Sequence, residues 1–215
     1  MTNIAQHVWK LLDNEPCIRR NMSLGLLNIR SLATYLIKQH KLDSTVDAVI
    51  SAIRRYKPKK HEDIFITAHN TMSQSINIST KSRLAEISLI KDSDVQSKIP
   101  KLFEIIQYNR GDVLRITQAN VAITLLVDEK NIDKITELIP KDKIIATRKN
   151  IAEINVHIHP QMQATPGILA VASNELAINN INIIQAMTCP PEMLWFVKEE
   201  DLLKAYNVLY QLCRK

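Results

Sequence analysis

The sequence predicts an α+β protein in which a helical N-terminal domain precedes two βαββαβ units. In residues 1–60, apolar side chains recur at the three- and four-residue spacing of amphipathic helices. From residue 82 onward, segments that alternate like strands are interleaved with helical patterns, and the same order of elements occurs twice, as a divergent repeat. These observations place domains at 1–60, 82–149 and 150–215, with 61–81 as the connecting segment.

Composition argues against several classes of protein. No apolar run reaches the roughly 18–20 residues of a membrane span, and the N-terminus lacks a signal-peptide pattern. The three cysteines lie far apart, which fits free thiols in a reducing compartment. With three glycines in the chain, a dinucleotide-binding fold or a phosphate-binding loop is disfavoured, because both need several glycines close together. We therefore expect a cytoplasmic protein without a membrane partner.

Charge is distributed unevenly along the chain. Residues 1–60 contain 11 Lys and Arg against 4 Asp and Glu, a net charge of +7, whereas residues 61–215 contain 17 against 18, a net of −1. A basic domain on a neutral body indicates a nucleic acid, an anionic surface or an acidic protein as partner. The alternative is a solvated helix surface without a partner.

The basic domain has the pattern of a helix-turn-helix. Asn28 is a predicted N-cap, followed by a helix with one apolar face. His40–Asp43 forms a short turn, Ser44 is predicted to cap the next helix with Asp47 completing a capping box, and Pro58 stops that helix. Two capped helices around a short turn give helix-turn-helix architecture. Such an architecture often serves only as a dimerisation element.

Segment 61–81 allows two interpretations. Asp63–Met72 has a helical pattern, and residues 75–79 alternate like a strand. That strand is either the wing of a winged-helix domain or a strand lent to the following domain.

The two later units are predicted element by element. The first comprises a strand Leu84–Ile90, a helix from Val95 to Ile106, strands Val113–Gln118 and Val121–Val127, a helix from Ile132 to Ile139, and a closing strand Lys143–Arg148. The second comprises a strand from Ile151, a helix over 166–179, two strands within 181–198, and a helix Glu200–Arg214. In the strand from Ile151, Ala152, Ile154 and Val156 are expected to be buried, with Glu153 and Asn155 on the opposite face. The second unit lacks its fourth strand, and residues 75–80 are the candidate to supply it.

Thr165-Pro166-Gly167 is the best candidate for a ligand site. Thr165 can cap the following helix, Pro166 suits the first helical position, and Gly167 permits close approach of a ligand to the backbone. Free N–H groups at this helix start would bind an α-carboxylate. The alternative is that these residues only begin a helix.

The order of elements around Thr165-Pro166-Gly167 and Ile181-Asn182-Ile183 resembles the ACT domain, a small ferredoxin-like βαββαβ module that senses amino acids, and in particular the C-terminal ACT pair of aspartokinases. The resemblance implies an amino-acid site formed by a loop and the following strand, comprising Gln161, Met162, Gln163, Ala164, Thr165, Pro166, Gly167, Ile181, Asn182, Ile183 and Met187. Some ACT repeats have a structural role only. Two features depart from the family pattern: the turn Thr188–Glu192 is longer than the usual Thr-Ser-Glu, and Asp92–Val95 replaces the glycine-bearing loop in the first repeat.

The basic domain, through the segment from Gly25 to Tyr56, resembles uncharacterised prokaryotic proteins that join such a head to ACT domains. Nine of its residues are candidates to contact base edges or phosphates: Arg30, Ser44, Thr45, Ser51, Arg54, Arg55, Lys57, Lys59 and Lys60. Two observations favour the structural alternative. The helix dipole already favours cations in the last helical turn, and an exposed Asp47 would repel phosphate.

No catalytic motif is apparent in the sequence. His157 and His159 share one strand face but lack a third ligand at supporting spacing, so a polar sheet face is the simpler interpretation. No nucleophile with a neighbouring base, no cofactor motif and no kinase-type start is present, so we expect neither an enzyme nor a cofactor or metal. The leading hypothesis is an amino-acid-responsive, DNA-binding transcriptional regulator that forms a homodimer. The alternatives are a stand-alone regulatory subunit that controls a metabolic enzyme, and an assembly protein with two structural repeats.

Overall fold

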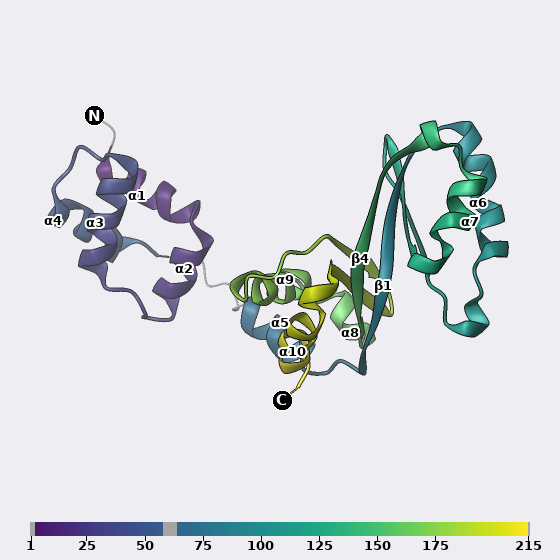
Figure 1. The fold of residues 1–215 in the computed structure, drawn as a ribbon. Helices are drawn as coiled ribbons and strands as arrows, with labels where there is room; N and C mark the ends of the chain where they lie inside the picture. Colours follow the sequence, from purple (N-terminus) through teal and green to yellow (C-terminus); the bar gives the residue numbers. More distant parts are fainter. Residues whose placement is uncertain (1–2, 58–63, 215) are drawn as a thin grey trace. The chain divides into compact units, whose positions relative to one another are not determined.

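The computed structural model describes residues 3–57 and 64–214, apart from the Gln161 side chain. They fall in two units, residues 1–63 and 64–215 (Figure 1). Buried apolar side chains form a separate core, or cores, within each unit. The first unit is helical, and the second is a mixed α/β structure with an antiparallel sheet.

The first unit contains helices α1 (Ile4–Asp13), α2 (Pro16–Ser23), α3 (Ile29–His40) and α4 (Val46–Arg55). Helices α1 and α3 both pack against α4, and Val8, Leu36 and Ile53 are buried among them. The Trp9 Nε1 group donates a hydrogen bond to the Ala52 carbonyl at 2.9 Å and so fixes α1 to α4. The apolar stripes predicted from helical spacing therefore meet in one core.

The cap predicted for α3 is confirmed, and the cap predicted for α4 is wrong. Asn28 accepts a hydrogen bond from the Ser31 N–H at 3.0 Å, as expected for an N-cap. At α4, Thr45 rather than Ser44 accepts from the helix, from the Ala48 N–H at 3.3 Å. Lys41 is left-handed with φ +50, and the Ser44 N–H donates to the Leu42 carbonyl, so the turn between the helices spans residues 41–44 and is shifted by one residue from the predicted turn.

The second unit places helices on a six-stranded sheet of order β2-β3-β1-β4-β6-β5 within residues 64–214. Its strands are β1 (Asn77–Ile90), β2 (Leu114–Gln118), β3 (Ala122–Asp128), β4 (Ile144–His157), β5 (Gln185–Cys189) and β6 (Glu192–Lys198). Its helices are α5 (Ile64–Met72), α6 (Ser93–Ile105), α7 (Ile132–Leu138), α8 (Pro160–Gln163), α9 (Ile168–Ile178) and α10 (Leu202–Leu212).

Strands β1 and β4 run antiparallel at the centre of the sheet (Figure 1). The segments predicted as separate strands on either side of Arg83, and likewise on either side of Asn150, belong to one continuous strand each. Arg83 and Asn150 are left-handed, with φ of 56 and 57, and the pairing register shifts near them. Residues 77–81 pair with 153–157, beside β6, whereas residues 84–90 pair with β3 as well.

Two cores lie between the sheet and its helices. Helices α6 and α7 cover one half of the sheet, where Ile87, Val95 and Leu125 are buried. Helices α5, α9 and α10 cover the other half, where Trp195 and Leu209 are fully buried. Figure 1 shows these two groups of helices on opposite sides of the β1–β4 pair.

A third core occupies the sheet face without helices, and it corrects the expectation that β4 buries only one face. Leu84, Leu126 and Phe196 are buried there. Glu153, expected on an exposed face, is only 4% exposed, and its carboxylate accepts two hydrogen bonds from Arg115 of β2, at 3.2 and 3.1 Å. The Gln185 amide also donates to the Thr117 hydroxyl at 3.2 Å, so the edge strands β5 and β2 approach each other across this face.

Removing the Arg115 cation should destabilise the second unit markedly. We expect Arg115→Met to lower the free energy of unfolding by about 3 kcal/mol, because it leaves the Glu153 carboxylate buried without its partner. Arg148→Met is the matched control, since the Arg148 side chain is 60% exposed and 3.8 Å from Glu86, and it should cost less than about 1 kcal/mol. Urea unfolding measures both, and equal costs would contradict the buried pair as a structural clamp.

Candidate functional site

The helix after Thr165-Pro166-Gly167 begins later than predicted. Helix α9 starts at Ile168, and Gly167 is its N-cap residue, left-handed with φ +90. The Thr165 N–H donates to the Met162 carbonyl at 3.2 Å, which closes a turn after α8. Thr165 and Pro166 therefore connect α8 to α9 and do not occupy the cap and first helical positions.

Helix α5 packs against this helix start. A Cβ atom at Gly167 would lie 3.0 Å from the Ile64 Cγ2 atom and 3.5 Å from the Ala68 Cβ atom. Ala68 and Met72 are fully buried in the same core as Met162 and Ile168. Glycine at this position thus serves a close helix–loop contact inside the protein, in addition to its left-handed conformation.

The structure brings together most of the residues predicted to bind an amino acid. Met162, Ile181 and Ile183 pack in the core beneath α9, while Gln163, Ala164, Pro166 and Asn182 are exposed near it and Thr165 is half-buried. The Gln161 side chain lies outside the described part of the chain. The strand predicted from Ile181 begins at Gln185. Residues 181–183 follow α9 without regular secondary structure, and the Ile181 N–H donates to the Leu176 carbonyl at 3.0 Å.

Met187 does not join this group. It lies on β5 and packs against the third core, on the sheet face without helices. Its sulfur is 4.0 Å from the Thr117 hydroxyl of β2. The described geometry therefore separates Met187 from the loop before α9.

Helix α6, which has the corresponding place in the other half of the sheet, starts differently. The Asp92 carboxylate caps it by accepting from the Val95 N–H at 2.9 Å, and the Lys143 ammonium lies 2.6 Å from the same side chain. The hydrogen bond from Lys143 and that from Val95 lower the pKa of Asp92 below its ordinary value. The N-cap residue of α9, Gly167, makes no side-chain cap. The N-cap residue thus supplies a carboxylate at α6, and only its backbone at α9.

The residues predicted to contact DNA lie mostly on the surface of the first unit. Arg30, Thr45, Ser51, Arg54, Arg55 and Lys57 are exposed and Ser44 is half-buried, whereas Lys59 and Lys60 fall outside the described residues. Arg55 donates from Nε to the Ser51 carbonyl at 3.2 Å, which holds its side chain along α4. The Thr45 hydroxyl is engaged as the α4 cap, so it is fixed at the helix start.

His157 and His159 lie at the end of β4 and just beyond it, half-buried and exposed respectively. Among residues 3–57 and 64–214, no cluster of three or more His, Cys, Asp or Glu has the geometry of a metal site. In the same part of the chain, no helix is long and apolar enough to cross a membrane.

Sequence reasoning missed two features of this region. Helix α5 packs on Gly167 although the two are far apart in the sequence, and no local sequence pattern predicts this contact. The pairing of Arg115 with Glu153 also escaped prediction, because each residue alone fits an exposed strand position. The glycine at 167 was the one usable signal, since only three glycines occur in the chain.

Comparison with known proteins identifies the fold through solved structures. No protein-family model matches the chain. No curated protein matches it either. The aspartate kinase of Clostridium acetobutylicum matches with a TM-score of 0.53 at 18% identity, covering 66% of this chain and 35% of the kinase. The regulatory subunit of aspartate kinase from Thermus thermophilus matches with a TM-score of 0.51 at 16% identity, covering 65% of this chain and 98% of that subunit.

A structure of aspartokinase α and β subunits gives a TM-score of 0.52 at 15% identity, over 64% of this chain and 97% of the matched chain. The match to the clostridial enzyme spans about a third of that kinase, whereas the two other chains are matched almost completely. The chain therefore contains the fold of the ACT regulatory domains of aspartokinases.

Substitution of Gly167 tests its contact with α5. We expect Gly167→Ala to destabilise the protein by about 1 kcal/mol through its positive φ and by roughly a further 1 kcal/mol through the contact with Ile64. Gly111→Ala is the matched control, because Gly111 has φ +77 but nothing within 4 Å of its Cβ position. Urea unfolding of both variants measures the difference, and equal losses would contradict the packing of α5 on this loop.

Proposed function

We propose that this chain is an amino-acid-responsive regulatory protein, in which residues 64–215 are two ACT repeats that share their central strands. The observation that carries the proposal is the contrast between two helix starts. Helix α6 is capped by the carboxylate of its N-cap residue Asp92, whereas the N-cap residue of α9 is Gly167, which provides no side-chain cap. The first N–H groups of α9 are suited to a carboxylate from outside the chain.

Within this proposal the amino acid occupies the loop before α9 and the segment 181–183. Its α-carboxylate accepts from the N–H groups at the start of α9, and Gln163, Thr165 and Asn182 supply polar contacts around it. The Gln161 side chain remains part of the proposed site on sequence grounds. Met187 belongs to the set implied by family resemblance, but its packing on the opposite sheet face argues against direct contact.

Helix α5 gives the site a route to the rest of the chain. It contacts Gly167, and it is the first described element after the basic unit in sequence. A ligand at the loop would have to share this surface with α5 and would shift its position. The amino acid then regulates the basic unit if it binds the protein with different affinity when α5 is in its original and in its shifted position. Such coupling free energies are typically 1–3 kcal/mol.

The basic unit is the proposed output domain. Helices α3 and α4 form a helix-turn-helix, with Ser44, Thr45 and Ser51 at the start and outer face of α4. Arg30, Arg54, Arg55, Lys57, Lys59 and Lys60 would neutralise phosphates, and a homodimer would present two such units to DNA. The net charge of +7 in residues 1–60 and the exposure of Ser51 and Arg54 on α4 support this role.

A regulatory subunit that controls a separate enzyme is the second candidate. It is favoured by the match over 98% of the Thermus thermophilus chain, which is itself described as a regulatory subunit of aspartate kinase. In that case the basic unit binds an acidic surface of the partner enzyme. Both candidates share the amino-acid site and differ in what the basic unit contacts.

Thermal unfolding in the presence of each of the twenty amino acids tests the sensing function. A ligand present at about a hundred times its dissociation constant stabilises by roughly 2.7 kcal/mol, which should raise the melting temperature by a few degrees. We expect a shift with one amino acid or a chemically related pair. The Gly167→Ala variant should lose this shift and Gly111→Ala should keep it. No shift with any amino acid would contradict the proposal.

Binding to DNA as a function of salt separates the two output roles. If the basic unit contacts several phosphates, the logarithm of the association constant should fall linearly with the logarithm of salt concentration, by about 0.9 per phosphate neutralised. Arg54→Glu/Arg55→Glu should abolish binding, whereas the control Lys101→Glu/Lys204→Glu, an equal charge change on exposed residues of α6 and α10, should not. Binding that survives the first variant would exclude this helix as the DNA contact, and no binding of DNA by the unmodified protein would favour the enzyme-partner role.

A further inference from the structure

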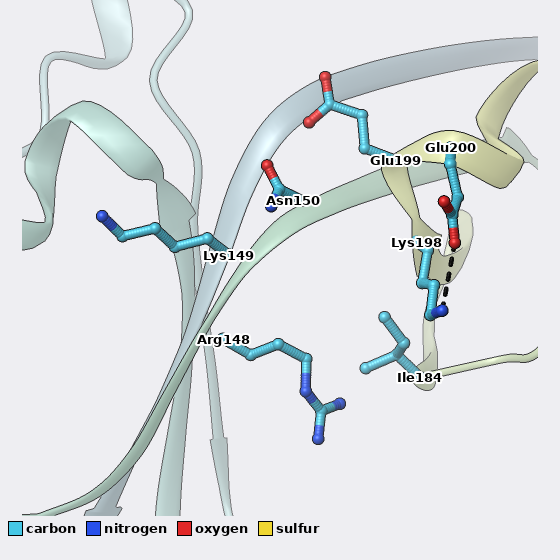
Figure 2. A pocket seen from close by; sticks show the side chains of 7 residues that line it. All are labelled: Arg148, Lys149, Asn150, Ile184, Lys198, Glu199 and Glu200. Carbon is cyan, nitrogen blue, oxygen red and sulfur yellow. Dashed lines mark hydrogen bonds and ion pairs between the residues drawn. The ribbon is translucent and has the colours of Figure 1, made fainter.

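A cavity of about 500 Å³ lies where β4 passes Asn150, beside the end of β6. It is lined by Arg148, Lys149, Asn150, Ile184, Lys198, Glu199 and Glu200. Figure 2 shows the side chains of Arg148 and Lys198 directed toward Ile184, while Lys149 extends away from them. The volume falls in the range of small-molecule sites, roughly 300–1,000 Å³.

The opposite side of the β1–β4 pair, toward β3, has a related site in which the cation has a carboxylate partner. There the Lys81 ammonium forms an ion pair with the Asp128 carboxylate at 2.9 Å. Asp128 also accepts a hydrogen bond from the Val113 N–H at 2.6 Å. A carboxylate from the last residue of β3 thus neutralises the lysine of β1.

The strand registers make Arg148 the counterpart of Lys81, and Lys198 the counterpart of Asp128. Asp128 pairs with Leu84 of β1, and Lys198 pairs with Ile151 of β4. Lys81 and Arg148 each precede that pairing residue by three positions, and each faces a glutamate across the β1–β4 ladder. The cavity therefore has a cation at the position where the other half has a carboxylate.

This replacement leaves two cations facing one cavity without a carboxylate between them. Arg148 lies 3.8 Å from Glu86, at a longer distance than the Lys81–Asp128 pair, and its side chain is 60% exposed. Lys198 pairs with Glu200 at 3.1 Å, on the rim of the cavity, with both side chains mostly exposed. A guanidinium and an ammonium at such a site bind a carboxylate by charge-assisted hydrogen bonds.

We propose that this cavity binds the carboxylate group of a small metabolite, which lies between Arg148 and Lys198 and takes the part that Asp128 plays on the opposite side of the β1–β4 pair. Glu199 and Glu200 disfavour a polyphosphate by charge repulsion, and Ile184 provides an apolar contact for the carbon skeleton of the ligand. The site is distinct from the loop before α9. The proposal does not rest on the amino-acid-sensing function.

Isothermal titration of the full chain with acetate, succinate, glutamate and inorganic phosphate tests the site. We expect a carboxylate to bind, with affinity weakened about tenfold or more in Arg148→Gln and in Lys198→Gln, since each loses a charged hydrogen-bond donor. Lys101→Gln removes the same charge from an exposed position on α6 and should leave binding unchanged. Phosphate binding more tightly than every carboxylate, or no binding by any probe, would overturn the proposal.

Lys198→Asp provides a second, independent variant, because it restores the carboxylate found at Asp128. We expect it to abolish carboxylate binding while the melting temperature stays the same or rises, as the new side chain pairs with Arg148. Binding that persists in both Lys198→Asp and Arg148→Gln would place the ligand elsewhere. An amino acid bound only at the α9 loop would be distinguished by its loss in Gly167→Ala and its retention in Arg148→Gln.

Discussion

The antiparallel pairing of β1 with β4 is the constraint on which the second unit depends. Each strand passes from one half of the sheet to the other, so residues 77–81 serve the half that contains β5 and β6, while residues 144–148 serve the half that contains β2 and β3. Without residues 77–81, one side of β4 would be an unpaired strand edge. The two halves are therefore one folding unit, and a movement of α5, which leads into β1, acts on the strand that joins them.

The two halves of the second unit share their order of elements and differ in how their charged and polar groups are paired. In one half, the Asp92 carboxylate caps the start of α6 and pairs with a lysine. The Asp128 carboxylate, at the end of β3, pairs with another lysine. The corresponding positions of the other half hold Gly167 and Lys198. One half thus closes its polar sites with its own side chains, and the other presents backbone N–H groups and cations. This contrast is the physical basis for placing ligands on the half that contains α9.

Much of the fold could be predicted, because periodicity reports local burial. Apolar spacing identified α1, α3 and α7, and Asn28 marked a helix start through its own side chain. The continuity of β1 and β4 could not be predicted, since Arg83 and Asn150 adopt left-handed conformations that most residues avoid and that the long strand pair imposes. The burial of Glu153 depends on Arg115 from another strand, and the cover over Gly167 comes from α5. Such contacts depend on the tertiary fold and cannot be recognised in a short stretch of the sequence.

Hydrogen exchange of the full chain, measured with and without the amino acid that raises its melting temperature, tests the central claim most directly. We predict slower exchange in residues 162–171 and 181–184, together with altered exchange in α5, because the ligand and α5 share the surface around Gly167. Exchange around Asp92 and the start of α6 should stay unchanged, since that helix start is already capped. Protection centred on α6, or no change in residues 162–171, would contradict an amino-acid site at α9.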